Sequence, residues 1–253
     1  NPLFRSHGRT WHLRLPWGWN TGQSGPLETN WRPNANELHN AEVESICKKY
    51  LELRYRLLPF NYTIAREARD TGLPMMRALW LHYPNDPQAV GLGSEYLWGR
   101  DLLVAPVVEK GANSRRVYLP EGDWFDWWTG ERLPGRQWIE RPEDLATMPI
   151  YVRAGAFIPL DPVRQYTDQP YDDDGESLGY LHGSDSKETW IHFKWQDAAR
   201  KLTIEPGRQM KKWPGGTRVF DVEVADSAAK PKHVEFHGRR IEVFTQRLRA
   251  DKD

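Results

Sequence analysis

One short stretch near the start of the chain combines residue types that could hold a polar ligand. Residues 4–8 read FRSHG, and His7 stands there between a serine and a glycine, a poor place for a helix cap or a core side chain. A neutral imidazole offers one hydrogen-bond donor and one acceptor on opposite edges, which suits a ligand that carries hydroxyl groups. Gly8 lets the backbone turn sharply beside it. Taken alone, a histidine before glycine is more often an ordinary loop residue.

Other large side chains near this stretch could line the same site. The chain has 13 tryptophans, and planar side chains with one polar edge can stack on sugar rings, although packing in a core or at its rim is the more common role of any one tryptophan. The candidates for such lining are Arg5, Trp11, Trp17, Trp19 and Asn20. For each of them, rim packing is as good an interpretation as ligand binding.

Carboxylates are densest at residues 172–176, where the chain reads DDDGE. Such a group could bind calcium, but we favour a solvated acidic turn. Asp101 and Asp126 stand at the borders of predicted strands, where aspartate commonly accepts hydrogen bonds from turn amides. His12 lacks a second ligand at metal spacing and the other histidines are scattered, so no metal site is predicted.

The overall composition limits the classes of partner. The chain has 253 residues, with 35 Lys and Arg against 35 Asp and Glu, whereas a nucleic-acid or anionic-membrane partner normally requires clustered positive charge. The single cysteine, Cys47, excludes an internal disulfide and falls at an apolar helical position, which indicates a buried thiol. No apolar stretch approaches the roughly 20 residues that span a bilayer.

Helical periodicity begins after an irregular, tryptophan-rich segment over residues 1–33. Apolar residues recur at helical spacing from about residue 41, with Asn40 as a plausible N-cap and Pro59 expected to end or kink the helix. A second helix is expected to stop at Gly72. The run PMMRALWLHY then predicts a buried strand, which together with the helices indicates an α/β unit.

From about Tyr96 the chain shows short β-rich runs separated by turn residues, as in LLVAPVV, RRVYLP, WFDWW, TWIHFKW, KLTIEP and RVFDVEV. This spacing is typical of β-sandwiches, and the loss of periodicity near residues 161–168 suggests two adjacent β-domains. The predicted fold class is therefore α/β plus all-β.

Several of these strings together resemble one family. The segments FRSHG, YLELRYRLLPFNYTIAREARDTGLPMMRALWL, EYLWGRDLLVAPVVEKG, RRVYLPEGDWFDWWTGE, MPIYVRAGAFIPL and YDDDGES occur in the order found in the C-terminal half of glycoside hydrolase family 31. That family comprises α-glucosidases, α-xylosidases and relatives. Residues 190–253 resemble its distal β-domain more loosely, and VRQYTDQP leads to YDDDGES without the strands usual between them.

The resemblance implies a domain order and a set of substrate contacts. Residues 1–91 would close a (β/α)8 catalytic barrel with PMMRALWL as its final strand, residues 92–162 would form the proximal β-sandwich, and residues 163–253 the distal β-domain. His7 would bind hydroxyls of the sugar at the C-terminal mouth of the barrel, where such enzymes place their chemistry. Arg5 and Trp17 would line that mouth.

The resemblance also implies that the catalytic acids lie elsewhere. The family cleaves α-glycosides with retention, which needs two carboxyl groups about 5 to 5.5 Å apart, and in this family both are aspartates upstream of the FRSHG motif. We therefore assign no catalytic residue within these 253 residues and expect the polypeptide to extend before Asn1. No cofactor is expected, and the expected partners are an α-linked oligosaccharide or glycoside and the N-terminal part of the same enzyme.

Two other interpretations remain open at this point. The chain could act alone as a carbohydrate-binding or structural β-sandwich module, although a barrel's last elements cannot bury their apolar faces without the other strands. It could also complement a separate N-terminal polypeptide. Specificity for α-glucosides or α-xylosides is not decided by these residues.

Overall fold

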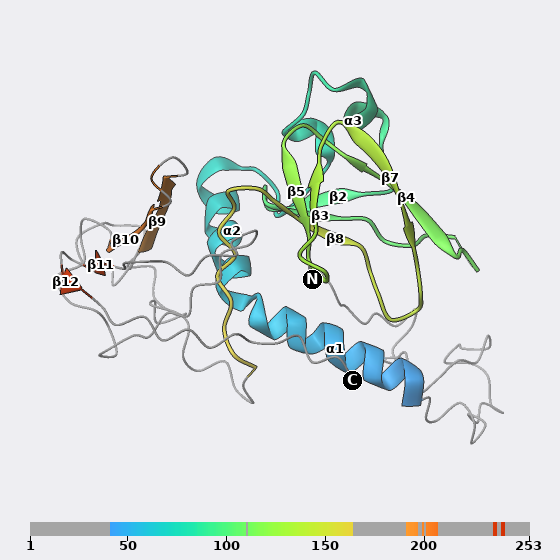
Figure 1. Cartoon of the computed structure of the whole chain (residues 1–253), viewed down its shortest axis with the longest axis horizontal. Helices are drawn as coiled ribbons and strands as arrows, with labels where there is room; N and C mark the ends of the chain where they lie inside the picture. Colours follow the sequence, from blue (N-terminus) through green and yellow to red (C-terminus); the bar gives the residue numbers. More distant parts are fainter. Residues whose placement is uncertain are drawn as a thin grey trace, which may run out of the picture. The chain divides into compact units, whose positions relative to one another are not determined.

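A computed structural model describes residues 41–109, 111–163, 191–196, 199, 201–206, 235–236 and 239–240. The chain divides into two compact units, Asn1–Pro170 and Tyr171–Asp253 (Figure 1). Most of the described elements are β-strands, accompanied by a few helices. We describe the two units separately.

The first unit begins with two helices, α1 (Ala41–Arg56) and α2 (Leu58–Thr71). Pro59 lies in the first turn of α2, where a missing backbone N–H costs little, so the expected break falls between the helices and the chain changes direction there (Figure 1). Gly72 ends α2 in the left-handed conformation with its N–H donating to the carbonyl of Ala68, as predicted. The proposed cap Asn40 lies outside the described residues.

The prediction of one buried strand over PMMRALWLHY is wrong in its extent. Only β1 (Met76–Arg77) is extended; it pairs antiparallel with β2 (Tyr96–Trp98), and a short 3-10 helix, η2 (Leu79–Leu81), follows at once. A third helix, α3 (Pro87–Gly91), begins where the Asp86 carboxylate accepts hydrogen bonds from two backbone N–H groups. The apolar run thus supplies a turn of helix as well as a strand, a distinction that periodicity alone does not make.

Two antiparallel sheets follow. The larger has the order β1-β2-β3-β8-β5-β6, and the smaller pairs β4 with β7. Their remaining bounds are β3 Leu102–Val104, β4 Ser114–Leu119, β5 Asp123–Asp126, β6 Arg132–Pro134, β7 Gln137–Pro142 and β8 Ile150–Arg153.

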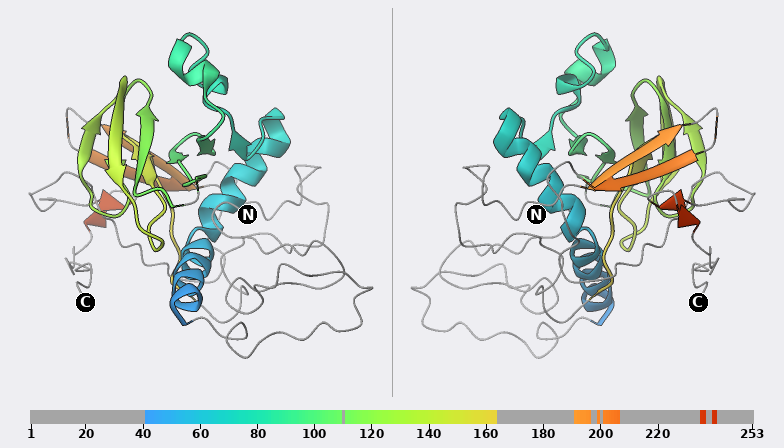
Figure 2. Two further views of the ribbon diagram at one scale, coloured as in Figure 1. Left: turned by 90° about the vertical axis from the view of Figure 1, so that its right-hand side faces the viewer. Right: turned by 90° about the vertical axis from the view of Figure 1, so that its left-hand side faces the viewer.

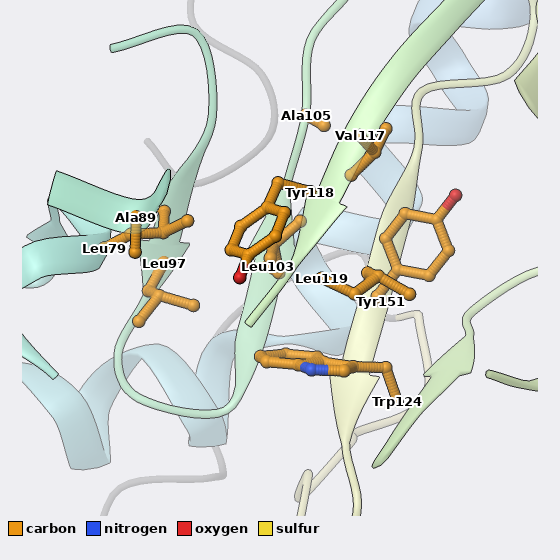
Figure 3. Packing of buried hydrophobic residues seen from close by; sticks show 10 residues of the cluster. All are labelled: Leu79, Ala89, Leu97, Leu103, Ala105, Val117, Tyr118, Leu119, Trp124 and Tyr151. Carbon is orange, nitrogen blue, oxygen red and sulfur yellow. The ribbon is translucent and has the colours of Figure 1, made fainter. Parts of the chain in front are cut away.

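The alternation of side chains along the central strands separates two cores. Leu102 and Val104 of β3 face the helices with Leu53, Leu57 and other residues of α1 and α2, whose ribbons run beside the sheet in Figure 2. Leu103, between them, faces the other way and packs with Trp124 and residues of β4 (Figure 3). The larger sheet is therefore apolar on both faces, and each fully buried leucine stabilises the fold by about 1.5–3 kcal/mol.

In the second unit the described residues form two antiparallel pairs. β9 (Ile191–Gln196) pairs with β10 (Lys201–Pro206), and β11 (Glu235–Phe236) pairs with β12 (Arg239–Arg240). The strands expected in TWIHFKW and KLTIEP correspond to the first pair. The run RVFDVEV lies outside the described residues.

Candidate functional site

The residues proposed as substrate contacts, Arg5, His7 and Trp17, lie outside the described residues, and so does the acidic stretch 172–176. The described part of the chain shows the helices and sheets that follow the FRSHG segment in sequence. Its polar groups gather in three places: around Arg77, around Tyr50, and between the two sheets.

Arg77 forms a buried basic centre at the end of β1. Its side chain is fully buried, and it donates hydrogen bonds to the Pro74 carbonyl at 2.7 Å and to the Glu67 carboxylate of α2 at 2.8 Å. A further guanidinium nitrogen lies 3.1 Å from Nε2 of His82. Burial lowers the pKa of His82, and the charge of Arg77 lowers it further, so the imidazole is neutral and accepts this bond. The centre ties α2 to the segment after β1.

Tyr50 anchors α1 to the loop that precedes β8. Its hydroxyl donates to the carbonyl of Ala146 at 3.1 Å and accepts from the N–H of Met148 at 2.6 Å. Lys49 donates to the same Ala146 carbonyl at 2.9 Å, with its ammonium 4.0 Å from the centre of the Trp128 ring. The Trp128 indole donates to the Met148 carbonyl at 2.8 Å. These contacts join a helix and a loop that are far apart in sequence.

The two aspartates at strand borders differ in their partners. Asp126 accepts from the backbone N–H groups of Trp128 at 2.7 Å and Thr129 at 2.9 Å, which confirms the prediction of a turn bond. For Asp101 that prediction is wrong, because its carboxylate instead accepts two hydrogen bonds from the Arg153 guanidinium, at 3.0 and 2.5 Å. Both carboxylates serve structure, and Cys47 is buried as expected.

A set of buried and half-buried charges between the sheets was missed from sequence. Arg115 on β4 and Arg141 on β7 are placed with Glu95, Asp126 and Glu143. Strand periodicity gives a signal for the arginines: Arg115 shares a strand face with Val117 and Leu119, both completely buried. An arginine in register with core residues indicates a buried ionic group.

The buried carboxyls of the described residues contact other parts of the fold. Among the described stretches between Ala41 and Arg240, no three His, Cys, Asp or Glu side chains are grouped so that they could hold a metal ion. The buried carboxyls Glu95 and Asp126 face backbone N–H groups or arginine. No helix in the described part is long and apolar enough to cross a membrane.

Comparison with known proteins identifies the β-rich part of the first unit. Residues 72–158 match the family model described as Glycosyl hydrolase family 31 C-terminal domain. These residues include β1 to β8, and thus both sheets of the first unit.

Relatives match over a longer stretch. The chain is 35% identical over 193 residues to Alpha-glucosidase 2 of Bacillus thermoamyloliquefaciens, covering 68% of this chain and 24% of that protein. A dextranase of this family from Flavobacterium johnsoniae, solved with glucose, has a TM-score of 0.57 and 40% identity over 65% of this chain and 23% of its own. A family 31 α-xylosidase from Xanthomonas citri has a TM-score of 0.59 and 35% identity over 63% of this chain and 19% of its own.

The chain spans about a quarter or less of the length of these relatives. Within that span the family model and both solved structures agree on one family. The chain therefore belongs to glycoside hydrolase family 31 and corresponds to a C-terminal portion of its members.

Proposed function

We propose that the protein containing this chain hydrolyses α-linked glucosides or xylosides with retention of configuration. The observation that carries the proposal is the match of residues 72–158 to the family's C-terminal domain, joined to relatives named as an α-glucosidase, a dextranase and an α-xylosidase. A carbohydrate is the proposed substrate because the dextranase was solved with glucose.

The acids of this reaction are proposed to lie in polypeptide upstream of the FRSHG segment. Retaining hydrolysis needs a nucleophile and an acid/base about 5 to 5.5 Å apart. Asp101 and Asp126 are held by an arginine each, and Glu95 is buried against the backbone of β4. None of these three carboxyls is placed to attack a sugar or to protonate a leaving group.

Within this chain, His7 is proposed to hydrogen-bond hydroxyls of the sugar, with Arg5 and Trp17 beside it. We also propose that residues 1–91 complete a (β/α)8 barrel, that residues 92–162 form the proximal β-sandwich, and that residues 163–253 form the distal β-domain. The packing of α1 and α2 on the larger sheet supports this order, because a barrel's last helices would need such a surface to be held in place.

The test is to assay the whole protein that contains this chain with chromogenic α-glucosides and α-xylosides. Turnover of one or both is expected, whereas the 253-residue chain alone is expected to be inactive. His7→Ala in the whole protein should lower kcat/KM at least about tenfold, since it removes hydrogen bonds worth about 1.4 kcal/mol or more. His192→Ala, at an exposed position of β9, is the matched control and should leave kcat/KM unchanged.

Two results would contradict the proposal. Robust turnover by the isolated chain would show that the catalytic acids lie within it. Sugar binding by the whole protein without any turnover would instead favour a carbohydrate-binding module.

A further inference from the structure

Two arginines face each other inside the first unit. Arg115 on β4 is the direct cross-strand partner of Arg141 on β7. Each lies on the strand face that packs toward the core, beside Val117 and Ile139 respectively. Like charges directly opposite one another in a sheet repel, and burial strengthens that repulsion. This pairing therefore requires negative charge nearby.

Three carboxyl groups supply it. Asp126 forms an ion pair with Arg141 and is 6% exposed. The Glu143 side chain is 1% exposed, with Oε1 3.5 Å from Nε of Arg141. Glu95 is 3% exposed, and the charge of Arg115 acts on both Glu95 and Glu143. We call these five residues, Glu95, Arg115, Asp126, Arg141 and Glu143, the buried charge cluster.

The hydrogen bonds within the buried charge cluster are unequally shared. Asp126 is well satisfied, since it also accepts from two turn N–H groups. Among the described residues, Glu95 accepts only from the N–H of Tyr118, at 3.3 Å to each oxygen. In the part of the chain that the structure describes, neither oxygen of Glu143 has a hydrogen-bond partner, and neither does Nε of Arg115. Glu95 and Glu143 are therefore the carboxyls least stabilised as anions.

With every group ionised, the buried charge cluster has one excess negative charge, because it contains three carboxylates and two guanidinium groups. Lys49 and Asp144, the charged groups beside it, have opposite signs and cancel. The phenols of Tyr50 and Tyr151 also face it, and burial raises the pKa of each, so both stay neutral. An uncompensated buried charge is costly, and a carboxyl in that position takes up a proton instead.

We propose that the buried charge cluster is a proton-binding site, which holds one exchangeable proton on Glu95 or Glu143 in weakly acidic to neutral solution. Asp126 is held by Arg141 and by the turn amides of Trp128 and Thr129. Burial supports this assignment, because it raises the pKa of Glu95 to about 7 and that of Glu143 to about 6.

The proton links the stability of the first unit to pH. In the unfolded chain both glutamates titrate near the ordinary value of about 4.3, so unfolding above that pH releases the bound proton. Stability is therefore expected to fall as the pH rises from about 4.5 to about 7. For one proton, the unfolding equilibrium constant increases by up to about tenfold per pH unit.

The experiment is denaturant unfolding of the full 253-residue chain from about pH 5 to about pH 8. Glu95→Gln and Glu143→Gln keep the shape of the side chain but cannot release a proton, so each should flatten the pH dependence of the unfolding free energy. The flattened range should extend to a higher pH in Glu95→Gln than in Glu143→Gln. Glu121→Gln is the matched control, since that side chain is 67% exposed in a surface ion pair with Arg136. A wild-type slope in both cluster variants would overturn the proposal.

A second measurement decides the question without any variant that must fold. Carbon-13 NMR titration of the glutamate side-chain carboxyls should reveal at least one that titrates above about pH 5.5, well outside the usual range. If every glutamate in the folded chain titrates below about pH 5, the cluster holds no proton and the proposal fails.

Discussion

The hydroxyl of Tyr50, in the middle of α1, accepts a hydrogen bond of 2.6 Å from the backbone N–H of Met148. The two residues are 98 positions apart in sequence. The same hydroxyl donates to Ala146, so one side chain satisfies both a donor and an acceptor of the loop before β8. Side chains that use both functions of a hydroxyl in this way hold a loop in a single position.

Tyr50→Phe tests this anchor. The change keeps the ring, which also packs edge-on against Trp128, but leaves the Met148 N–H without its acceptor. The free energy of unfolding is expected to fall by about 1–2 kcal/mol, measured by chemical denaturation. Tyr55→Phe, at an exposed position of the same helix, is the control and should change it by less than about 0.5 kcal/mol. Equal effects would mean that the hydroxyl does not hold the loop.

The packing of the larger sheet on both of its faces can be tested at Leu103. Its side chain has no exposed surface and lies in the core between the two sheets, so Leu103→Ala should lower the free energy of unfolding by about 2–5 kcal/mol. Leu145→Ala makes the same chemical change at a position that is 67% exposed, and it should cost less than about 0.5 kcal/mol. A small loss at Leu103 would contradict the assignment of that core.

Gly135 lies at a close approach of two backbone segments. A Cβ at this position would collide with the carbonyl oxygens of Pro120 and Gly122, neither of which can move as a flexible side chain would. Gly135→Ala is therefore expected to destabilise the first unit by about 1–3 kcal/mol or more, measured as a lower Tm. Gly93→Ala is the matched control, because a Cβ there meets no atom within 4 Å. Its Tm should stay within a few degrees of the wild type.

Local features of the fold could be predicted because short-range chemistry decides them. Gly72 is an example: a glycine after a helical run favours the left-handed C-cap that the structure has. The turn bonds of Asp126 follow from the same kind of local rule. The run after Pro74 was harder, since its apolar residues fit both a strand and the turn of helix over Leu79–Leu81.

Contacts between segments far apart in the chain could not be predicted from the sequence. Arg115 can be placed on an inward face from its register with Val117, but its pairing with Arg141 depends on how β4 and β7 meet. The approach of Glu95 to Arg115 depends on a third segment, the one before β2. The contacts proposed for His7 lie outside the described residues, so they remain predictions.

His82 provides a pH dependence of opposite sign to that of the buried charge cluster. Burial and the neighbouring Arg77 lower its pKa in the folded protein, so the unfolded chain binds the proton more readily. Stability from this residue is present above the unfolded pKa of about 6.5 and is lost as the pH falls below it. His82→Gln keeps a hydrogen-bond acceptor for Arg77 but has no proton to gain. As the pH falls from about 6.5 to about 5, the stability of the variant relative to that of the wild type should therefore increase, because the buried charge cluster contributes equally to both.

The comparison requires a histidine in a different setting. His192 on β9 is exposed, so His192→Gln should leave the pH dependence of unfolding as it is in the wild type. If His82→Gln behaves in the same way as His192→Gln, the imidazole does not accept the bond from Arg77 as a neutral ring. In that case the 3.1 Å contact between Arg77 and His82 would not make the stability of the first unit depend on pH. Of the hydrogen bonds of Arg77, those to Glu67 and Pro74 would then be the ones that tie α2 to the segment around β1.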